Sequence, residues 1–92
     1  IMIVKLVEIK DSGRPTLGCN EVFVNTEHVV CVRPTTPTWP SSILMPEGID
    51  HNTQFSKVFL DHGQNGIAIT VVGPPALIES KINTAKRQLL KG

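Results

Sequence analysis

The second half of the chain has the most regular alternation of apolar and polar residues. Residues 57–61 and 67–72 each place apolar side chains at every second position. This period of two is typical of strands whose two faces are unequally buried. The residues between them, 62–66, include two glycines, which permit the positive φ angles of a tight turn. We therefore expect a β-hairpin over residues 57–72.

A helical period follows the hairpin. Pro75 suits the first turn of a helix, because its missing N–H would have no partner there. From residue 78 onward, apolar residues fall at i, i+4, i+7 and i+11 and form one narrow stripe, which consists of Ile78, Ile82, Ala85 and Leu89. We expect a helix over Pro75–Lys91, ended by Gly92.

The first half contains three further runs that are rich in β-branched residues. We expect strands over Met2–Ile9, Glu21–Asn25 and His28–Arg33, with a polar, turn-forming link over residues 10–20. Short links between strands imply antiparallel neighbours, since parallel pairing needs a long crossover.

Together these elements predict an α+β fold in one domain, residues 1–92. A chain of 92 residues with 40% hydrophobic side chains suffices for one modest core. We expect a strongly curved antiparallel sheet of about five strands, similar to a small open barrel, with the C-terminal helix packed on it. Helix and sheet each have one apolar side, and packing them together buries both.

A proline-rich stretch, residues 34–53, interrupts this pattern. Its prolines exclude a regular strand or helix through residues 34–40, and loops of this length are usually functional or disordered. Two interpretations stay open: a lid that folds back over the core, or an arm that docks on a protein partner or on a sister subunit. The candidate partner-binding residues are Trp39, Ile43, Leu44 and Met45.

Charge is unevenly distributed, although the net charge is only +1. Residues 74–92 carry four basic residues against one acidic residue, a net charge of +3. These cations either complement the negative end of the helix or form a nucleic-acid-binding patch on a small β-barrel. The candidate residues for this alternative are Lys81, Lys86, Arg87 and Lys91.

Catalytic chemistry is not expected. His51 and His62 each follow an aspartate, but adjacent residues of an extended chain point apart, so neither aspartate holds its own histidine. Cys19 and Cys31 lack the closely spaced ligand pairs of a zinc site, and no phosphate-loop motif is present. We expect no enzyme activity, no catalytic residue, no metal site and no cofactor.

The cellular compartment follows from cysteine content and hydropathy. Two cysteines are few for a secreted domain of this size, so we expect reduced thiols and a cytoplasmic protein, in the host cytoplasm if a phage encodes it. No run approaches the ~20 apolar residues of a membrane span, so we expect no membrane partner.

Two stretches carry a family resemblance. Val22–Val32 (VFVNTEHVVCV) and Lys57–Gly63 (KVFLDHG), followed by a strand and a helix, resemble small FlbD/SwrD-like flagellar-accessory proteins and similar short phage and bacterial proteins. The resemblance covers roughly residues 20–33 and 56–82. The chain departs from it in residues 34–53 and at residues 73–75 (Gly-Pro-Pro). The resemblance implies an accessory role and no catalytic residue.

The favoured hypothesis is a small non-catalytic module for protein binding, assembly or regulation, whose partner is another protein or a second copy of the chain. Removal of residues 35–45 is then expected to abolish partner capture or oligomerisation and to leave the core folded. Nucleic-acid binding through the basic C-terminal helix is the alternative.

Overall fold

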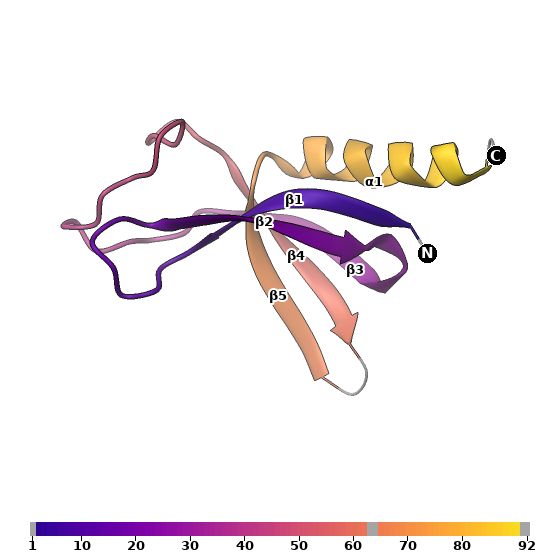
Figure 1. Ribbon diagram of the computed structural model, residues 1–92, viewed down its shortest axis with the longest axis horizontal. Helices are drawn as coiled ribbons and strands as arrows, with labels where there is room; N and C mark the ends of the chain where they lie inside the picture. Colours follow the sequence, from indigo (N-terminus) through magenta and orange to yellow (C-terminus); the bar gives the residue numbers. More distant parts are fainter. Residues whose placement is uncertain (1, 63–64, 91–92) are drawn as a thin grey trace.

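Five strands and one long helix make up the described part of the chain (Figure 1). The computed structural model describes the backbone of residues 2–62 and 65–90, and the side chains of residues 2–61 and 66–86. The strands are β1 (Ile3–Lys10), β2 (Gly18–Asn25), β3 (Val29–Thr35), β4 (Phe55–His62) and β5 (Asn65–Val72). A 3-10 turn, η1 (Thr26–His28), joins β2 to β3, and α1 spans Pro75–Leu90. The expected α+β class is confirmed.

The strands form one antiparallel sheet in the order β2-β1-β5-β4-β3. It is an open sheet, with β2 and β3 as its outer strands. The β1–β2 and β4–β5 hairpins pair along their full length, but β1 and β5 pair only between Glu8 and Val71. The β4–β5 hairpin therefore diverges from the β1–β2 hairpin, as Figure 1 shows. This divergence produces the strong curvature that the sequence predicts.

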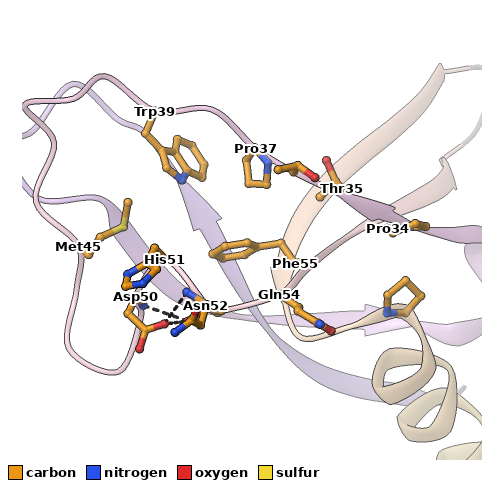
Figure 2. A pocket seen from close by; sticks show the side chains of 13 residues that line it. Pro34, Thr35, Pro37, Trp39, Met45, Asp50, His51, Asn52, Gln54 and Phe55 are labelled. Atoms are coloured by element: carbon orange, nitrogen blue, oxygen red, sulfur yellow. Dashed lines mark hydrogen bonds between the residues drawn. The ribbon is translucent and has the colours of Figure 1, made fainter.

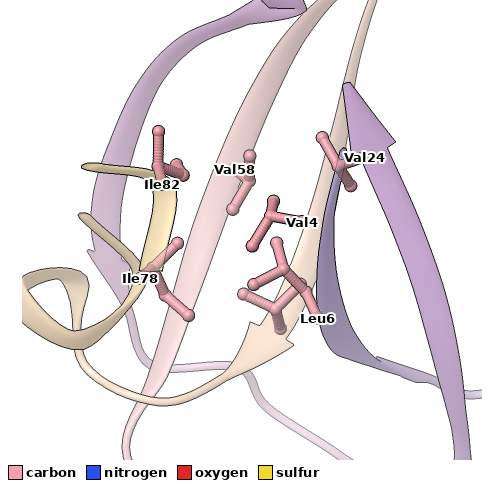
Figure 3. Close-up of a cluster of buried hydrophobic side chains, with 7 residues drawn as sticks. Val4, Leu6, Val24, Val58, Ile78 and Ile82 are labelled. Atoms are coloured by element: carbon pink, nitrogen blue, oxygen red, sulfur yellow. The ribbon is translucent and has the colours of Figure 1, made fainter. Parts of the chain in front are cut away.

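The inner face of the curved sheet holds the main core (Figure 3). Residues directly opposite each other in an antiparallel pair lie on the same face of the sheet. The pairing of the strands therefore places the buried side chains of four strands together on this face. These strand residues are Val4, Leu6, Val24, Val58 and Val71. From α1, Ile78 and Ile82 pack onto them, and each buried Ile or Leu side chain contributes about 2 kcal/mol. The expected helix stripe is thus confirmed at 78 and 82; the Leu89 side chain lies outside the described residues.

The junction between β5 and α1 is tightly tied to β4. Gly73 has φ of 119°, its N–H donates to the Gln54 carbonyl at 2.8 Å, and its own carbonyl accepts from the Ser56 hydroxyl at 2.7 Å. The Pro74 carbonyl then accepts the first helical N–H groups, from Leu77 and Ile78. These bonds fix where α1 starts and direct it back across β1, β3 and β4.

Two strand boundaries differ from the sequence-based expectation. Gly18–Asn20, expected within a polar link, belongs to β2, because these residues pair with the end of β1 and the preceding Leu17 is buried. Pro34, expected to end regular structure, lies inside β3 opposite Ser56. An outer strand bonds a neighbour on one side only, so a proline there loses no ladder bond. The expected hairpin turn lies partly outside the described residues, since 63 and 64 are not among them.

Candidate binding pocket

The proline-rich segment between β3 and β4 packs over a second apolar cluster, distinct from the main core. The buried members are Ile9, Leu17 and Phe55, and the partly buried members are Trp39, Ile43, Ile49 and Val72. Trp39 and Ile43 thus lie as the lid interpretation expects. Leu44 and Met45, the other two candidate partner-binding residues, are 59% and 42% exposed. The four residues are close in sequence, but Trp39 and Ile43 pack against the second cluster, whereas the side chains of Leu44 and Met45 are exposed.

Backbone hydrogen bonds hold this segment against the β1–β2 connection. The Leu44 carbonyl accepts from the Leu17 N–H, and the Leu44 N–H donates to the Pro15 carbonyl, both at 2.8 Å. Thr16 and Leu44 form a short parallel bridge between them. Leu44 is therefore fixed through its backbone, while its side chain stays exposed.

A pocket of about 720 Å³ lies between this segment and the adjoining ends of β3 and β4 (Figure 2). We call it the Trp39 pocket. Its apolar lining comes from one tryptophan, one phenylalanine, one methionine and several prolines: Trp39, Phe55, Met45, Pro34, Pro37 and Pro75. Ligand pockets commonly enclose about 300–1,000 Å³ with a mostly apolar lining, so its size and composition suit binding.

A hydrogen-bonded turn supplies the polar rim of the pocket. The Asp50 carboxylate accepts the Asn52 N–H at 2.8 Å, the Asp50 N–H donates to the Thr53 hydroxyl at 3.0 Å, and the Thr53 N–H donates to the Asp50 carbonyl at 3.1 Å. These bonds order residues 50–53 and present His51 and Asn52 at the rim. The Asp50 carboxylate bonds residues 52 and 53 of this turn, and no hydrogen bond joins it to His51 among the residues that the structure describes.

The groups around the pocket are mainly apolar side chains and neutral polar side chains. Among the residues that the structure describes, no group of three or more His, Cys, Asp and Glu side chains could hold a metal ion. Cys19 and Cys31 are both free, and Cys19 is exposed. The pocket can bury an apolar group against two aromatic rings and bond the polar atoms beside it.

Phe55 and the Asp50–Thr53 turn belong to the pocket, although the sequence pattern does not single them out. Phe55 begins β4, two residues before the expected start of that strand. Asp50 itself carries a signal for the turn, since an aspartate side chain commonly accepts the backbone N–H two residues further on, here that of Asn52.

The candidate nucleic-acid-binding residues do not form one described patch. Lys81 and Lys86 are both exposed on α1, and five residues of helix separate them by about 140° around its axis. The side chains of Arg87 and Lys91 lie outside the described residues.

No helix within the described ranges is long and apolar enough to cross a membrane.

Comparison with protein-family models, curated proteins and solved structures finds no match for this chain. The resemblance to FlbD/SwrD-like proteins accordingly stays a prediction.

Proposed function

We propose that this protein is a non-catalytic protein-binding module, and that the Trp39 pocket holds an extended, apolar segment of a protein partner. The observation that carries the proposal is the pocket itself, in which Trp39 and Phe55 lie beside three prolines and one methionine. Aromatic-lined grooves of this kind bind extended, proline-containing segments in several peptide-recognition domains.

The surroundings of the pocket favour a peptide over a compact ligand. Polar side chains flank the apolar lining on two sides, from Thr35 and Thr36 at the end of β3 and from residues 50–54 before β4. An extended peptide carries a polar group at every residue, which such flanking groups can bond, while alternate side chains enter the apolar centre.

Trp39 provides a direct readout of occupancy. It is the only tryptophan and the chain has no tyrosine, so intrinsic fluorescence excited at the indole band reports this pocket alone. Peptides selected from a displayed random library would be titrated while the emission of Trp39 is followed. Saturable changes are expected; a library that yields no saturable ligand contradicts the proposal.

Two adjacent exposed residues provide a matched pair of variants. Met45 lines the pocket, whereas Leu44 does not, and both side chains are more than a third exposed. We expect Met45→Lys to weaken peptide binding about tenfold or more, equivalent to about 1.4 kcal/mol, and Leu44→Lys to change it less than about twofold. Equal effects of the two substitutions would place the binding site elsewhere.

Nucleic-acid binding through α1 has less support, because Lys81 and Lys86 point in different directions around the helix. The discriminating measurement is a gel shift with single- and double-stranded oligonucleotides at increasing salt. Phosphate contacts make such binding strongly salt-dependent. A salt-sensitive shift that Lys81→Glu and Lys86→Glu abolish would favour this alternative over the peptide proposal.

A further inference from the structure

The two outer strands of the sheet differ in how well they resist further pairing. β3 contains Pro34, and its register with β4 shifts between Val29 and Cys31. Prolines and bulges are two of the devices that block an outer strand from pairing with another chain. In contrast, β2 pairs with β1 in unbroken register over all eight of its residues and contains no proline.

The register also shows which backbone groups of β2 face outward. The Thr26 N–H donates to the Met2 carbonyl at 2.8 Å, immediately beyond the paired residues. Hydrogen-bonded pairs alternate along an antiparallel ladder, so Val24, Val22 and Asn20 bond β1. Both backbone groups of Cys19, Glu21 and Phe23 point to the open edge, as does the N–H of Asn25, whose carbonyl begins the 3-10 turn η1. Among the described residues, no strand other than β1 pairs with them.

We infer that β2 is a homodimerisation edge, which pairs antiparallel with β2 of a second copy around a twofold axis at Phe23. In this register Phe23 lies opposite Phe23 of the second copy, Glu21 opposite Asn25, and Val22 opposite Val24. Across the interface, an aromatic side chain thus lies opposite an aromatic one, a polar side chain opposite a polar one, and an aliphatic side chain opposite an aliphatic one. Such cross-strand pairs stabilise a sheet.

The neighbouring registers fit a second copy less well. Shifting the axis to Glu21 sets the two Glu21 carboxylates directly opposite each other, which is repulsive. An axis at Val22 sets Phe23 opposite Glu21 and Asn20 opposite Val24, so that apolar side chains meet polar ones. Of these three registers, only the one with its axis at Phe23 places like side chains opposite each other, which points to a second copy as the occupant.

The surface around β2 supports the same occupant. Phe23 is 66% exposed and lies beside an apolar hollow of about 450 Å³. The hollow is lined mainly by inner-face side chains of β2, β4 and β5, namely Val22, Val24, Leu60, Ile67 and Ile69. Pairing at β2 places the Val22 and Val24 rows of two copies side by side, so the apolar surface becomes continuous between them.

The oligomeric state of two matched variants tests this inference. Phe23 and Val30 are almost equally exposed, at 66% and 67%, but they lie on the two different outer strands. In Phe23→Glu the new carboxylate lies opposite Lys5 within one chain and opposite a second carboxylate across the interface. Val30→Glu places the same charge on β3.

Sedimentation equilibrium of the full chain over a range of protein concentrations gives the readout, with circular dichroism to confirm folding. We expect a concentration-dependent dimer for the unaltered chain and for Val30→Glu, and a monomer for Phe23→Glu. A monomeric unaltered chain, a dimeric Phe23→Glu variant, or loss of the dimer in folded Val30→Glu would each overturn the inference.

Cysteine cross-linking tests the register. In a background with Cys19→Ser and Cys31→Ser, one chain carries Glu21→Cys and the other Asn25→Cys. Opposed residues of a hydrogen-bonded pair have Cα atoms about 5.5 Å apart, within the range a disulfide spans. Oxidation of the mixture is expected to give a mixed disulfide several-fold in excess of either homodimer. Preferential cross-linking of Glu21→Cys to itself, or no cross-link at all, would overturn the register.

Discussion

Two buried hydroxyl groups, those of Thr26 and Ser56, have opposite surroundings. Ser56 is fully buried and donates to the Gly73 carbonyl at 2.7 Å. Thr26 is 3% exposed, and its hydroxyl has no hydrogen-bond partner among the residues that the structure describes. A buried polar atom costs free energy when it is unpaired and little when it is bonded, so the two residues affect stability in opposite directions.

We expect Thr26→Val to raise the free energy of unfolding by about 1 kcal/mol, because a methyl group of similar shape replaces an unpaired hydroxyl. Urea denaturation followed by circular dichroism measures this change. A fall in stability would mean that the hydroxyl has a partner in solution.

Ser56→Ala is expected to lower the free energy of unfolding by about 1–2 kcal/mol, since the Gly73 carbonyl loses a buried donor. The same denaturation experiment gives the value. An unchanged midpoint would show that this bond does not secure the β5–α1 junction.

At the scale of elements, the junction before α1 depends on a glycine. Gly73 has a positive φ of 119°, and a Cβ added there would lie 3.1 Å from the Leu77 side chain. We expect Gly73→Ala to destabilise the fold by about 2 kcal/mol, through backbone strain and crowding together. Gly48 has a φ of 86° with open space around it, so Gly48→Ala isolates the strain and should cost about 1 kcal/mol. Thermal melts that rank Gly48→Ala as the more damaging change would contradict this assignment.

The packing of α1 on the sheet is tested by a charge at its buried stripe. Ile82 is 7% exposed within the main core, so Ile82→Asp buries an unpaired carboxylate and is expected to unfold the domain. Ala76, which is exposed on the same helix, provides the control: Ala76→Asp should leave the melting temperature nearly unchanged. A native melting temperature for Ile82→Asp would refute this placement of α1.

The hairpin and the helix could be predicted from sequence because their signals are local. The hairpin is predicted by the two-residue period of β4 and β5. The helix is predicted by Pro75 and by the apolar stripe that contains Ile78. Each of these signals involves only residues that are near in sequence. The start of β2 and the end of β3 depend instead on pairing with distant strands, which overrides the turn chemistry around Gly18 and the usual effect of Pro34. The pocket is harder to predict from the sequence than these strand boundaries, because Trp39 and Phe55 come together only when the segment between them folds back.

At the scale of the whole molecule, the two apolar clusters divide the structure into two halves. The radius of gyration is 14.1 Å, against about 12 Å for a compact chain of this length, and the extents are 47 × 30 × 19 Å. The main core includes Ile78 and Ile82 of α1, and the second cluster includes Trp39, Ile43 and Ile49 of the proline-rich segment. α1 and this segment extend toward opposite ends of the molecule (Figure 1).

This division changes the expected effect of removing residues 35–45. Thr35 pairs with Phe55, and Trp39 and Ile43 pack on the second cluster, so the deletion uncovers buried apolar surface. We expect replacement of residues 36–45 by a short glycine-serine linker to lower the melting temperature and to increase binding of a hydrophobic dye such as ANS. Unchanged dye binding would show that the segment does not cover this cluster in solution.

The single Glu8–Val71 pairing between β1 and β5 has a consequence for the order of folding. Hairpins β1–β2 and β4–β5 each close over a short loop, whereas the pair that joins them links residues 63 positions apart. Closing a long loop costs more conformational entropy, and such long-range contacts slow folding. During synthesis, the first hairpin therefore cannot join the rest of the sheet before residue 71 has been made. Until then, Val4 and Leu6 lack the β5 and α1 side chains that cover them in the main core.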